Sequence, residues 1–293
     1  MSESIAPPAV AAVPLGRVAL WMAGAITGFT VMAVAGRAVA PFHDTFEIMT
    51  WRSLFGLILV LAGAALTGHL GQIRARNLPL HALRNISHFA GQNLWFAALP
   101  LIPLAQVFAL EFTYPILVAL AAPALLGEVF QRRRLIAAGL GFAGVLIVAR
   151  PWNAGGINLG TALVLAAAFG FAGSALATKR LTARAPLVEI LFWITAMQLV
   201  FGLAATLADG TMRLPTAQSL PWLFVIGCAG LGGHLCMTRA LSLAPASVVV
   251  PIDFLRLPVS AVVGALLYHE ALAPAVLIGG AVILAANWIN SRN

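Results

Sequence analysis

The second half of this chain repeats the first at a constant shift of 142 positions, with no gap between the two copies. A proline, two glutamates, a tryptophan and a glycine-phenylalanine pair recur at that shift. The matched positions are Pro103 and Pro245, Glu47 and Glu189, Glu128 and Glu270, Trp51 and Trp193, and Gly28-Phe29 and Gly170-Phe171. Any fold that the chain adopts must therefore accommodate two similar units.

The composition is typical of a membrane protein. Of the 293 residues 61% are hydrophobic and only 9% are charged, and the mean hydropathy is +0.97, well outside the range of soluble domains. Apolar runs of about 18 to 23 residues are long enough to cross a hydrocarbon core about 30 Å thick as helices. We therefore predict an all-α polytopic membrane protein. Its ten transmembrane helices are expected at about 18–39, 45–67, 81–99, 103–126, 134–150, 159–178, 186–208, 219–241, 245–267 and 272–290.

Each copy contains five of these predicted helices. An odd number of crossings reverses the side from which the second copy enters the bilayer, so we predict two inverted five-helix repeats. They span residues 17–150 and 151–293 and follow a disordered cytoplasmic tail at 1–16, which contains three prolines and many alanines. Inverted repeats of this kind are typical of transporters, in which the substrate site lies between the repeats near the bilayer midplane.

The basic residues are sorted by side. Three lie in loops opposite the N-terminus, namely Arg37, Arg150 and Arg213, whereas most others lie on the N-terminal side. By the positive-inside rule this bias predicts cytoplasmic termini, in a bacterial-type inner (plasma) membrane. The formal charge of +8 does not indicate nucleic acid, because no folded basic patch with interleaved aromatic residues is present in the sequence.

Five ionisable side chains fall inside the predicted helices, namely Glu47, Arg52, Glu111, Asp253 and Arg256. On insertion scales each costs at least about 2.5 to 3.5 kcal/mol near a helix centre, so each requires a partner, water or a function. Three acids and two bases leave one acid without a cationic partner inside the membrane.

Glu111 and Asp253 are equivalent positions of the two copies. Each has a neighbour three residues later on the same helical face, Tyr114 in the first copy and Arg256 in the second. One interpretation is structural: Asp253 neutralises Arg256 within one turn, and Arg52 neutralises Glu111 between helices. The other is functional: the carboxylate of a small zwitterion meets Arg256, and its ammonium group meets Glu111 or Asp253. Both can hold at different steps of a transport cycle.

Glu47 lies close to the start of its helix, where it can simply reach the outer interface. Pro115 and Pro258 lie beside the paired polar positions and can free backbone carbonyls or kink their helices. The candidates for intramembrane ion pairs or gating are therefore Glu47, Arg52, Pro115 and Pro258.

Polar side chains also follow one face of the helix expected at 81–99. Arg84, His88, Gln92 and Trp95 have the spacing of a single helical face, and such a face does not point toward lipid. Either His88 and Gln92 bind backbone carbonyls and fix helix packing, or they line an aqueous cavity with Trp95 as its apolar wall. The second copy places His234 and Met237 at the positions of Gln92 and Trp95. The candidates for substrate binding are His88, Gln92, Trp95, Glu111, Tyr114, His234, Met237, Asp253 and Arg256.

These motifs resemble the drug/metabolite transporter superfamily in its EamA-type ten-helix branch. The doubled pattern consists of Ala98-Leu99, Pro103, Glu111-Phe112, Pro115 and Leu126-Gly127-Glu128, then Ala240-Leu241, Pro245, Asp253-Phe254, Pro258 and His269-Glu270. Within the branch, the chain is similar to YddG-type amino-acid exporters. The resemblance implies that helices 1–4 and 6–9 surround a central cavity, that helices 5 and 10 are peripheral, and that Glu128 and Glu270 end helices 4 and 9 and cap the following helix.

The expected function is therefore alternating-access transport of a small-molecule substrate across the lipid bilayer, by a monomer or homodimer. Export of neutral or aromatic amino acids is the first hypothesis, and uptake of another metabolite is the alternative. An intramembrane enzyme is disfavoured because the sequence contains neither HExxH nor GxSxG. No cofactor is expected, and no metal site, because the two cysteines, Cys228 and Cys236, lie eight residues apart on one helix.

Overall fold

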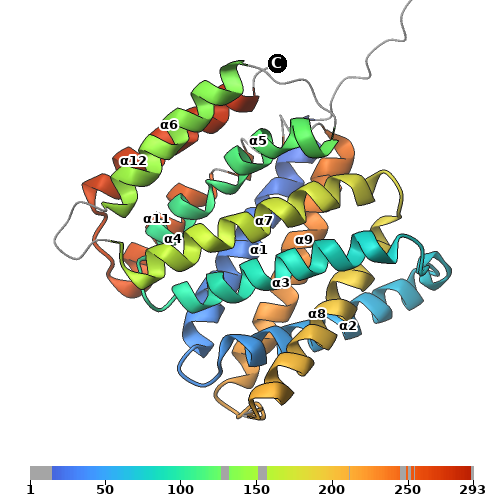
Figure 1. The fold of residues 1–293 in the computed structure, drawn as a ribbon. Helices are drawn as coiled ribbons and strands as arrows, with labels where there is room; N and C mark the ends of the chain where they lie inside the picture. The colour runs from blue at the N-terminus through green and yellow to red at the C-terminus, as the bar shows by residue number, and fades with distance from the viewer. Residues whose placement is uncertain are drawn as a thin grey trace, which may run out of the picture.

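The computed structural model is entirely helical over the residues that it describes (Figure 1). These are residues 15–126, 132–150, 157–210, 212–244, 249, 252–253 and 255–291. The helices are α1 (Leu15–Val39), α2 (Thr45–Leu66), η1 (Leu70–Gln72), α3 (Leu78–Ala98), α4 (Leu104–Glu111), α5 (Tyr114–Leu126), α6 (Arg132–Ala149), α7 (Leu159–Thr182), α8 (Leu187–Asp209), α9 (Leu220–Leu243), α11 (Arg256–Tyr268) and α12 (Pro274–Ser291).

Five of these helices, α1, α2, α7, α8 and α9, are long and apolar enough to cross a membrane. The helix α3 has similar length but carries the polar stripe predicted from the sequence. The expected tail at 1–16 lies outside the described residues, except that α1 already begins at Leu15. Glu128 and Pro245 also lie outside them.

Two predicted helices are each interrupted. The helix expected at 103–126 is divided, since α4 ends at Glu111 and α5 begins at Tyr114 after a two-residue turn. Pro115 explains the break, because it has no N–H group to donate to the carbonyl of Glu111 one turn earlier. The helix expected at 245–267 is likewise discontinuous: α11 begins at Arg256, directly after a turn at Leu255. The prediction of two continuous helices was therefore wrong.

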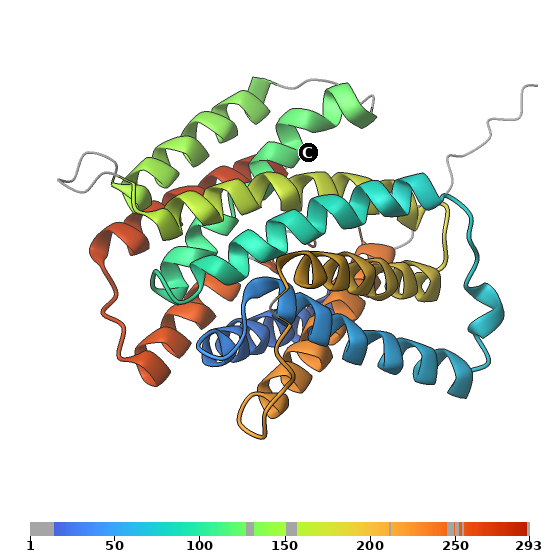
Figure 2. The ribbon, with the colours of Figure 1, turned by 60° about the horizontal axis from the view of Figure 1, so that its bottom comes forward.

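The helices pack as pairs that join the two halves of the chain. The main contacts are α1 with α9, α3 with α7, α6 with α12 and α2 with α8, and α4 also contacts α11. Exchanging the two copies turns the α1–α9 pair into the α7–α3 pair and leaves the α2–α8 and α6–α12 pairs unchanged. The views in Figures 1 and 2 place α6 and α12 together at one edge. The halves are therefore interleaved, and neither forms a separate domain in the described structure.

Glycine allows the two equivalent pairs to approach closely at the same positions. A Cβ atom on Gly28 of α1 would lie 2.8 Å from the carbonyl oxygen of Ala229 on α9, and one on Gly170 of α7 would lie 2.6 Å from that of Ser87 on α3. At the shift of 142 positions, Gly28 corresponds to Gly170 and Ser87 corresponds to Ala229. Small residues let helix backbones come together in membranes, so Gly28 and Gly170 permit the close approach of these two helix pairs.

At one end of the bundle, which we call the Arg37 end, the C-terminus of α1 is tied to two other segments. Arg37 donates hydrogen bonds to the carbonyls of Leu99 (2.7 Å) and Ile102 (2.6 Å) and forms an ion pair with Glu270 after α11. The second oxygen of Glu270 accepts the N–H of Leu104 at 2.9 Å. Glu270 therefore caps α4 of the other copy, and the implied cap on the following helix was wrong.

The two ends of the α2–α8 pair carry equivalent tryptophan contacts. At the Arg37 end, the indole of Trp51 on α2 donates to the carbonyl of Arg213 in the loop after α8, at 3.3 Å. At the opposite end, which we call the Trp193 end, Trp193 on α8 donates to the carbonyl of Arg74 after α2, at 2.9 Å. The N-termini of these two equivalent helices therefore lie at opposite ends of the bundle.

Candidate functional site

A buried cluster of three charges lies where the two helix breaks meet. The guanidinium nitrogen Nη2 of Arg256 is 3.1 Å from a carboxylate oxygen of Glu111 and 2.9 Å from one of Asp253. All three side chains are buried. Glu111 is the last residue of α4 and Arg256 is the first residue of α11, so the interruptions bring these charges together. We call Arg256, Glu111 and Asp253 the charge centre.

The charge centre is paired differently from the sequence-based interpretation. Asp253 contacts Arg256 three residues later, as that interpretation expects. Arg52, however, does not neutralise Glu111, because Arg256 contacts both acids through the same nitrogen. The spacing of residues along one helix predicts partners within a turn of that helix. It does not predict whether Arg52 on α2 or Arg256 on α11 reaches Glu111 on α4.

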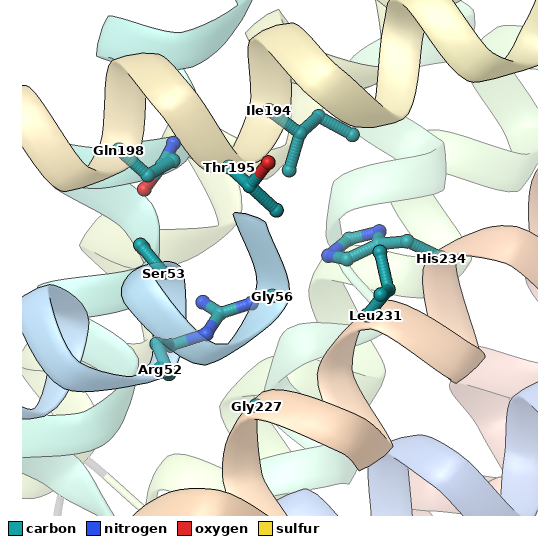
Figure 3. Close-up of a pocket in the computed structure, with 9 residues that line it drawn as sticks. All are labelled: Arg52, Ser53, Gly56, Ile194, Thr195, Gln198, Gly227, Leu231 and His234. Atoms are coloured by element: carbon teal, nitrogen blue, oxygen red, sulfur yellow. The ribbon is translucent and has the colours of Figure 1, made fainter. Parts of the chain in front are cut away.

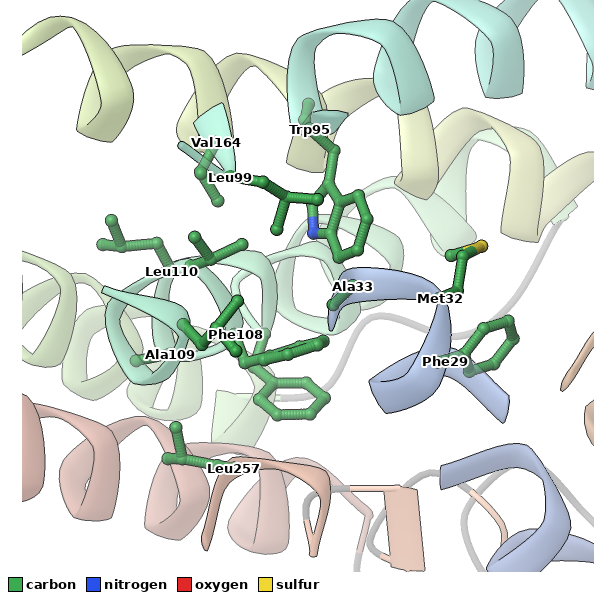
Figure 4. Close-up of a cluster of buried hydrophobic side chains, with 14 of the residues drawn as sticks. Phe29, Met32, Ala33, Trp95, Leu99, Phe108, Ala109, Leu110, Val164 and Leu257 are labelled. Atoms are coloured by element: carbon green, nitrogen blue, oxygen red, sulfur yellow. The ribbon is translucent and has the colours of Figure 1, made fainter. Parts of the chain in front are cut away.

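Aromatic side chains surround the guanidinium group of Arg256. Two of them, Phe29 and Phe108, belong with Trp95 to the buried hydrophobic cluster shown in Figure 4. The guanidinium carbon of Arg256 lies 5.1 Å from the ring centroids of Phe29 and Phe108 and 5.2 Å from that of Phe112, within the range of cation–π attraction. The indole N–H of Trp95 donates to Glu111 at 2.8 Å. Trp95 is therefore a hydrogen-bond donor to the charge centre, and not just the apolar wall that its position on α3 predicts.

The remaining candidates near the breaks are packed against the same core. Tyr114, directly after the α4–α5 turn, and Met237 on α9 are partly buried and contact the main hydrophobic cluster. Pro258 is the third residue of α11 and Pro115 the second residue of α5, so each proline stands at the start of a helix after a turn. Proline is well tolerated there because the first N–H groups of a helix have no partner within it.

Glu47 lies at the start of α2, but it is buried and not open to an interface. Its carboxylate accepts the backbone N–H of Asp44 at 3.2 Å, as part of a capping box, and contacts Nδ1 of His43 at 3.0 Å. A hydrogen bond from the backbone N–H of Arg213 joins it to the loop after α8. Glu47 therefore connects the start of α2 with the loop after α8, the kind of link expected of a gating residue.

A second polar site, which we call the arginine pocket, lies between α2, α8 and α9 (Figure 3). It is lined by Arg52, Ser53, Gly56, Ile194, Thr195, Gln198, Gly227, Leu231 and His234. The space inside it is only about 10 Å³, room for roughly one water molecule and far below the range of about 300 to 1,000 Å³ common for ligand pockets. A solute the size of a vitamin requires the pocket to open further.

Two histidines lie edge to face beside this pocket. The ring centroids of His88 and His234 are 5.1 Å apart, and within the described residues Nε2 of each is buried without a hydrogen-bond partner. His88 and Gln92 form no hydrogen bond to a backbone carbonyl in the described part of the chain, so the packing interpretation of these two residues lacks its expected contacts. His234 also packs against Phe29 at 5.3 Å. Since Phe29 stacks on Arg256, the ring of His234 links the arginine pocket to the charge centre.

Several polar residues of this region were missed by the sequence analysis. Arg84 is only 3% exposed; it was recognised as part of the polar stripe but was not among the substrate-binding candidates. Asn85, Gln198 and Ser53 are also buried and polar. A search limited to ionisable groups passes over the three neutral residues, and amides or hydroxyls inside apolar runs are the signal that could have found them.

The fold and the charge centre by themselves indicate a class of protein. Buried charges at interrupted helices, inside a bundle of apolar helices, are the arrangement of membrane transporters. Residues 16–150 and 158–292 each match the EamA-like transporter family. The chain therefore belongs to the EamA-like transporter family, which confirms the resemblance and places it among transporters and not among enzymes.

Individual proteins to which the chain is similar are also transporters. The chain is 28% identical over 277 residues to a riboflavin transporter of Rhizobium johnstonii, covering 94% of this chain and 91% of the relative. It is 24% identical over 266 residues to an S-adenosylmethionine uptake transporter of Rickettsia bellii, covering 91% and 90%. A solved crystal structure has a TM-score of 0.68 with 18% identity, covering 94% of this chain and 96% of that one, which shows that the fold is shared.

Proposed function

We propose that this protein is a secondary transporter of a bacterial inner membrane that moves a small organic solute by alternating access between its two halves. The observation that carries the proposal is the meeting of two interrupted helices at the charge centre. Discontinuous helices form the substrate sites of many transporters, because unwound backbone and buried charges are tolerated only where they line a binding site.

Inversion of the two repeats is supported by the ends at which equivalent residues lie. Glu47 and Trp51 of the first copy contact the loop after α8 at the Arg37 end, whereas Trp193 of the second copy contacts the loop after α2 at the Trp193 end. The reciprocal glycine contacts of α1 with α9 and of α7 with α3 support the same relation. The positive-inside rule favours a cytoplasmic Trp193 end, with both termini on that side.

The orientation can be tested with a pair of cysteines at equivalent loop positions, Ala75 and Ala217, which are both exposed. In a background with Cys228 and Cys236 changed to Ser, a membrane-impermeant maleimide should label Ala217→Cys in intact cells. Ala75→Cys should react only after the cells are opened. Labelling of both positions from one side would contradict the inverted arrangement.

For the solute, the charge centre supplies both signs of charge and its surroundings supply aromatic rings. A zwitterion with an aromatic or other apolar part suits this combination, so export of aromatic or neutral amino acids is one candidate. Uptake of a larger ring-containing metabolite is the second, and it is favoured by relatives named for riboflavin and for S-adenosylmethionine uptake. The direction follows from the gradients that act on the solute.

Counterflow in proteoliposomes tests the proposal. Vesicles loaded with unlabelled solute should transiently accumulate the same labelled solute, for at least one of tryptophan, phenylalanine, riboflavin and S-adenosylmethionine. Empty liposomes provide the baseline, and a run with and without a pH gradient shows whether protons are coupled. Recovery of chemically altered solute, or absence of counterflow across a wider metabolite panel, would contradict a carrier function.

A further inference from the structure

Arg52 is a buried cation without an anionic partner in the described structure. Its side chain is 7% exposed, and its one hydrogen bond runs from Nη1 to the sulfur of Met49 at 3.4 Å. A thioether is a weak acceptor, so most of the five guanidinium N–H donors have no acceptor among the described residues. Gly230 on α9 leaves the room for this group, because a Cβ atom there would lie 3.0 Å from Nη2 of Arg52.

Arg84 is the second such cation. It donates from Nη1 to the amide oxygen of Asn85 at 2.9 Å and from Nε to the hydroxyl of Thr178 at 3.3 Å, and both acceptors are neutral. Gln198, which lines the arginine pocket, donates to the backbone carbonyl of Asn85 at 3.0 Å. Arg84 therefore lies behind Asn85, which separates it from Gln198 in the pocket lining.

Further donors face the same space. Ser53, next to Arg52, is 4% exposed and has no hydrogen bond from its hydroxyl among the described residues. His88 and His234 each have a buried Nε2 without a partner in the described part of the chain, and a neutral imidazole can donate from one ring nitrogen. Both rings lie within electrostatic reach of both arginines.

The nearby acids are already engaged. Glu111 and Asp253 both contact Arg256, so the positive charge of that residue is matched within the charge centre. The residues that line the arginine pocket include no acid. Because an unpaired buried charge is costly, the two arginines are expected to destabilise the protein until an anion binds in the pocket beside Arg52.

We propose that the arginine pocket binds an anionic oxygen group of the transported solute, a carboxylate or a phosphate, through the guanidinium group of Arg52, and that the positive charge of Arg84 behind the lining adds to the attraction. The forked N–H donors of arginine match the geometry of both groups. The ring of the solute then extends past His234 and Phe29 toward the charge centre. This inference rests on the proposed transport function, since it assigns one part of the same solute to a second subsite.

The first test uses simple anions as probes on the purified full-length protein in lipid nanodiscs. Thermal unfolding is followed while potassium acetate or potassium phosphate replaces potassium chloride at equal ionic strength. The unfolding temperature of the wild-type protein should rise with acetate if the site takes a carboxylate, and with phosphate if it takes a phosphate. The rise should be lost in Arg52→Gln, and it should be smaller in Arg84→Gln, which removes the charge behind the lining, and in Arg52→Lys, which retains the charge but not the fork.

The matched control is Arg239→Gln, which removes an exposed arginine near the end of α9 and should respond to anions like the wild-type protein. Without added anion, Arg52→Gln should unfold at a higher temperature than the wild-type protein, because it removes an unpaired buried charge. A purely structural role for Arg52 would lower that temperature. The proposal is overturned if the wild-type protein shows no rise with either anion, or if Arg52→Gln shows the same rise.

A second test separates this inference from the transport function. Counterflow is compared for tryptophan against tryptophanamide and for riboflavin against riboflavin 5′-phosphate. The wild-type protein should favour the anionic member of one pair by about tenfold, as expected for hydrogen bonds to a charged group, and Arg52→Gln should remove the preference. Counterflow without any preference would refute the subsite and leave the carrier function intact. Anion binding without counterflow of any solute would refute the carrier function alone.

Discussion

The charge centre and the arginine pocket contain the same kinds of residue but treat their charges in opposite ways. Arg256 contacts two carboxylates at 3.1 and 2.9 Å and stacks among three phenylalanine rings. Arg52 contacts only a thioether sulfur among the described residues. Arg256 has its counter-charges inside the protein and needs no ligand to balance it. Arg52 has no carboxylate partner among the described residues, which indicates that a bound solute supplies its counter-charge.

This difference also bears on how the two sites can work together. The aromatic pair of His234 and Phe29 joins them at 5.3 Å, so a solute bound in the arginine pocket could reach the charge centre with its other end. Binding of an anion in the pocket would place negative charge near a centre that already holds two acids and one base. The charge centre is then expected to favour the cationic part of a zwitterion over its carboxylate.

The largest effect should follow from Arg256→Gln. This change leaves two buried carboxylates without a cation, and loss of one member of a buried ion pair costs about 3 to 5 kcal/mol. The unfolding temperature of the purified protein should therefore fall well below that of the wild-type protein. The triple variant with Glu111→Gln and Asp253→Asn removes the stranded charges as well and should recover most of the stability. A small change in the unfolding temperature of Arg256→Gln would contradict the proposed difference between Arg256 and Arg52.

A smaller loss is expected from Trp95→Phe, which keeps most of the ring but removes the N–H that binds Glu111 at 2.8 Å. Hydrogen bonds to charged groups contribute about 1.5 to 3 kcal/mol. The matched control is Trp193→Phe, whose N–H donates to a carbonyl at the bundle end, and which should cost less. Equal unfolding temperatures for the two variants would show that the bond to Glu111 adds little. Trp95→Ala should in addition alter the ranking of bulky and small solutes in counterflow.

The smallest effect should come from Ser53→Ala in the arginine pocket. If the hydroxyl joins Arg52 in binding the anion, acetate or phosphate should bind the variant roughly two- to tenfold more weakly, with the stability of the anion-free protein unchanged, as expected for one neutral hydrogen bond. Ser242→Ala is the control, since that hydroxyl donates to the carbonyl of Arg239 at the end of α9. An unchanged anion response would assign the pocket's recognition to the arginines alone.

Most of the architecture could be predicted from the amino-acid pattern, because a helix that crosses lipid must be apolar over its whole length. The apolar runs predicted helices such as α2 and α8 to within about two residues at most ends. The interruption at Glu111 was not predicted as a break, although Pro115 was recognised as a residue that can kink a helix. Proline allows either a bend or a full interruption, and the packing of α4 against α11 selects between them.

The residues of the candidate site could be predicted from the sequence, but most of the contacts between them could not. Glu111, Asp253 and Arg256 stood out because charges are rare inside apolar runs, and Trp95 because of its place on a polar face. That Trp95 donates to Glu111, and that Arg52 faces a different space, depended on how α2, α3, α4 and α9 are rotated and spaced. No local pattern contains that information, since residues on different helices are related only by packing.

The amino-acid sequence by itself determined that the protein is a membrane bundle of two repeated units with a small number of buried charges, because hydropathy and internal repetition are properties of the linear chain. The tertiary structure alone decided that Arg256 contacts both acids and that Arg52 and Arg84 have no acidic partner within the part of the chain that the structure describes. The physical reason is that an ion pair forms only between groups a few ångströms apart, and between helices that distance is set by the glycine contacts and helix breaks that position them.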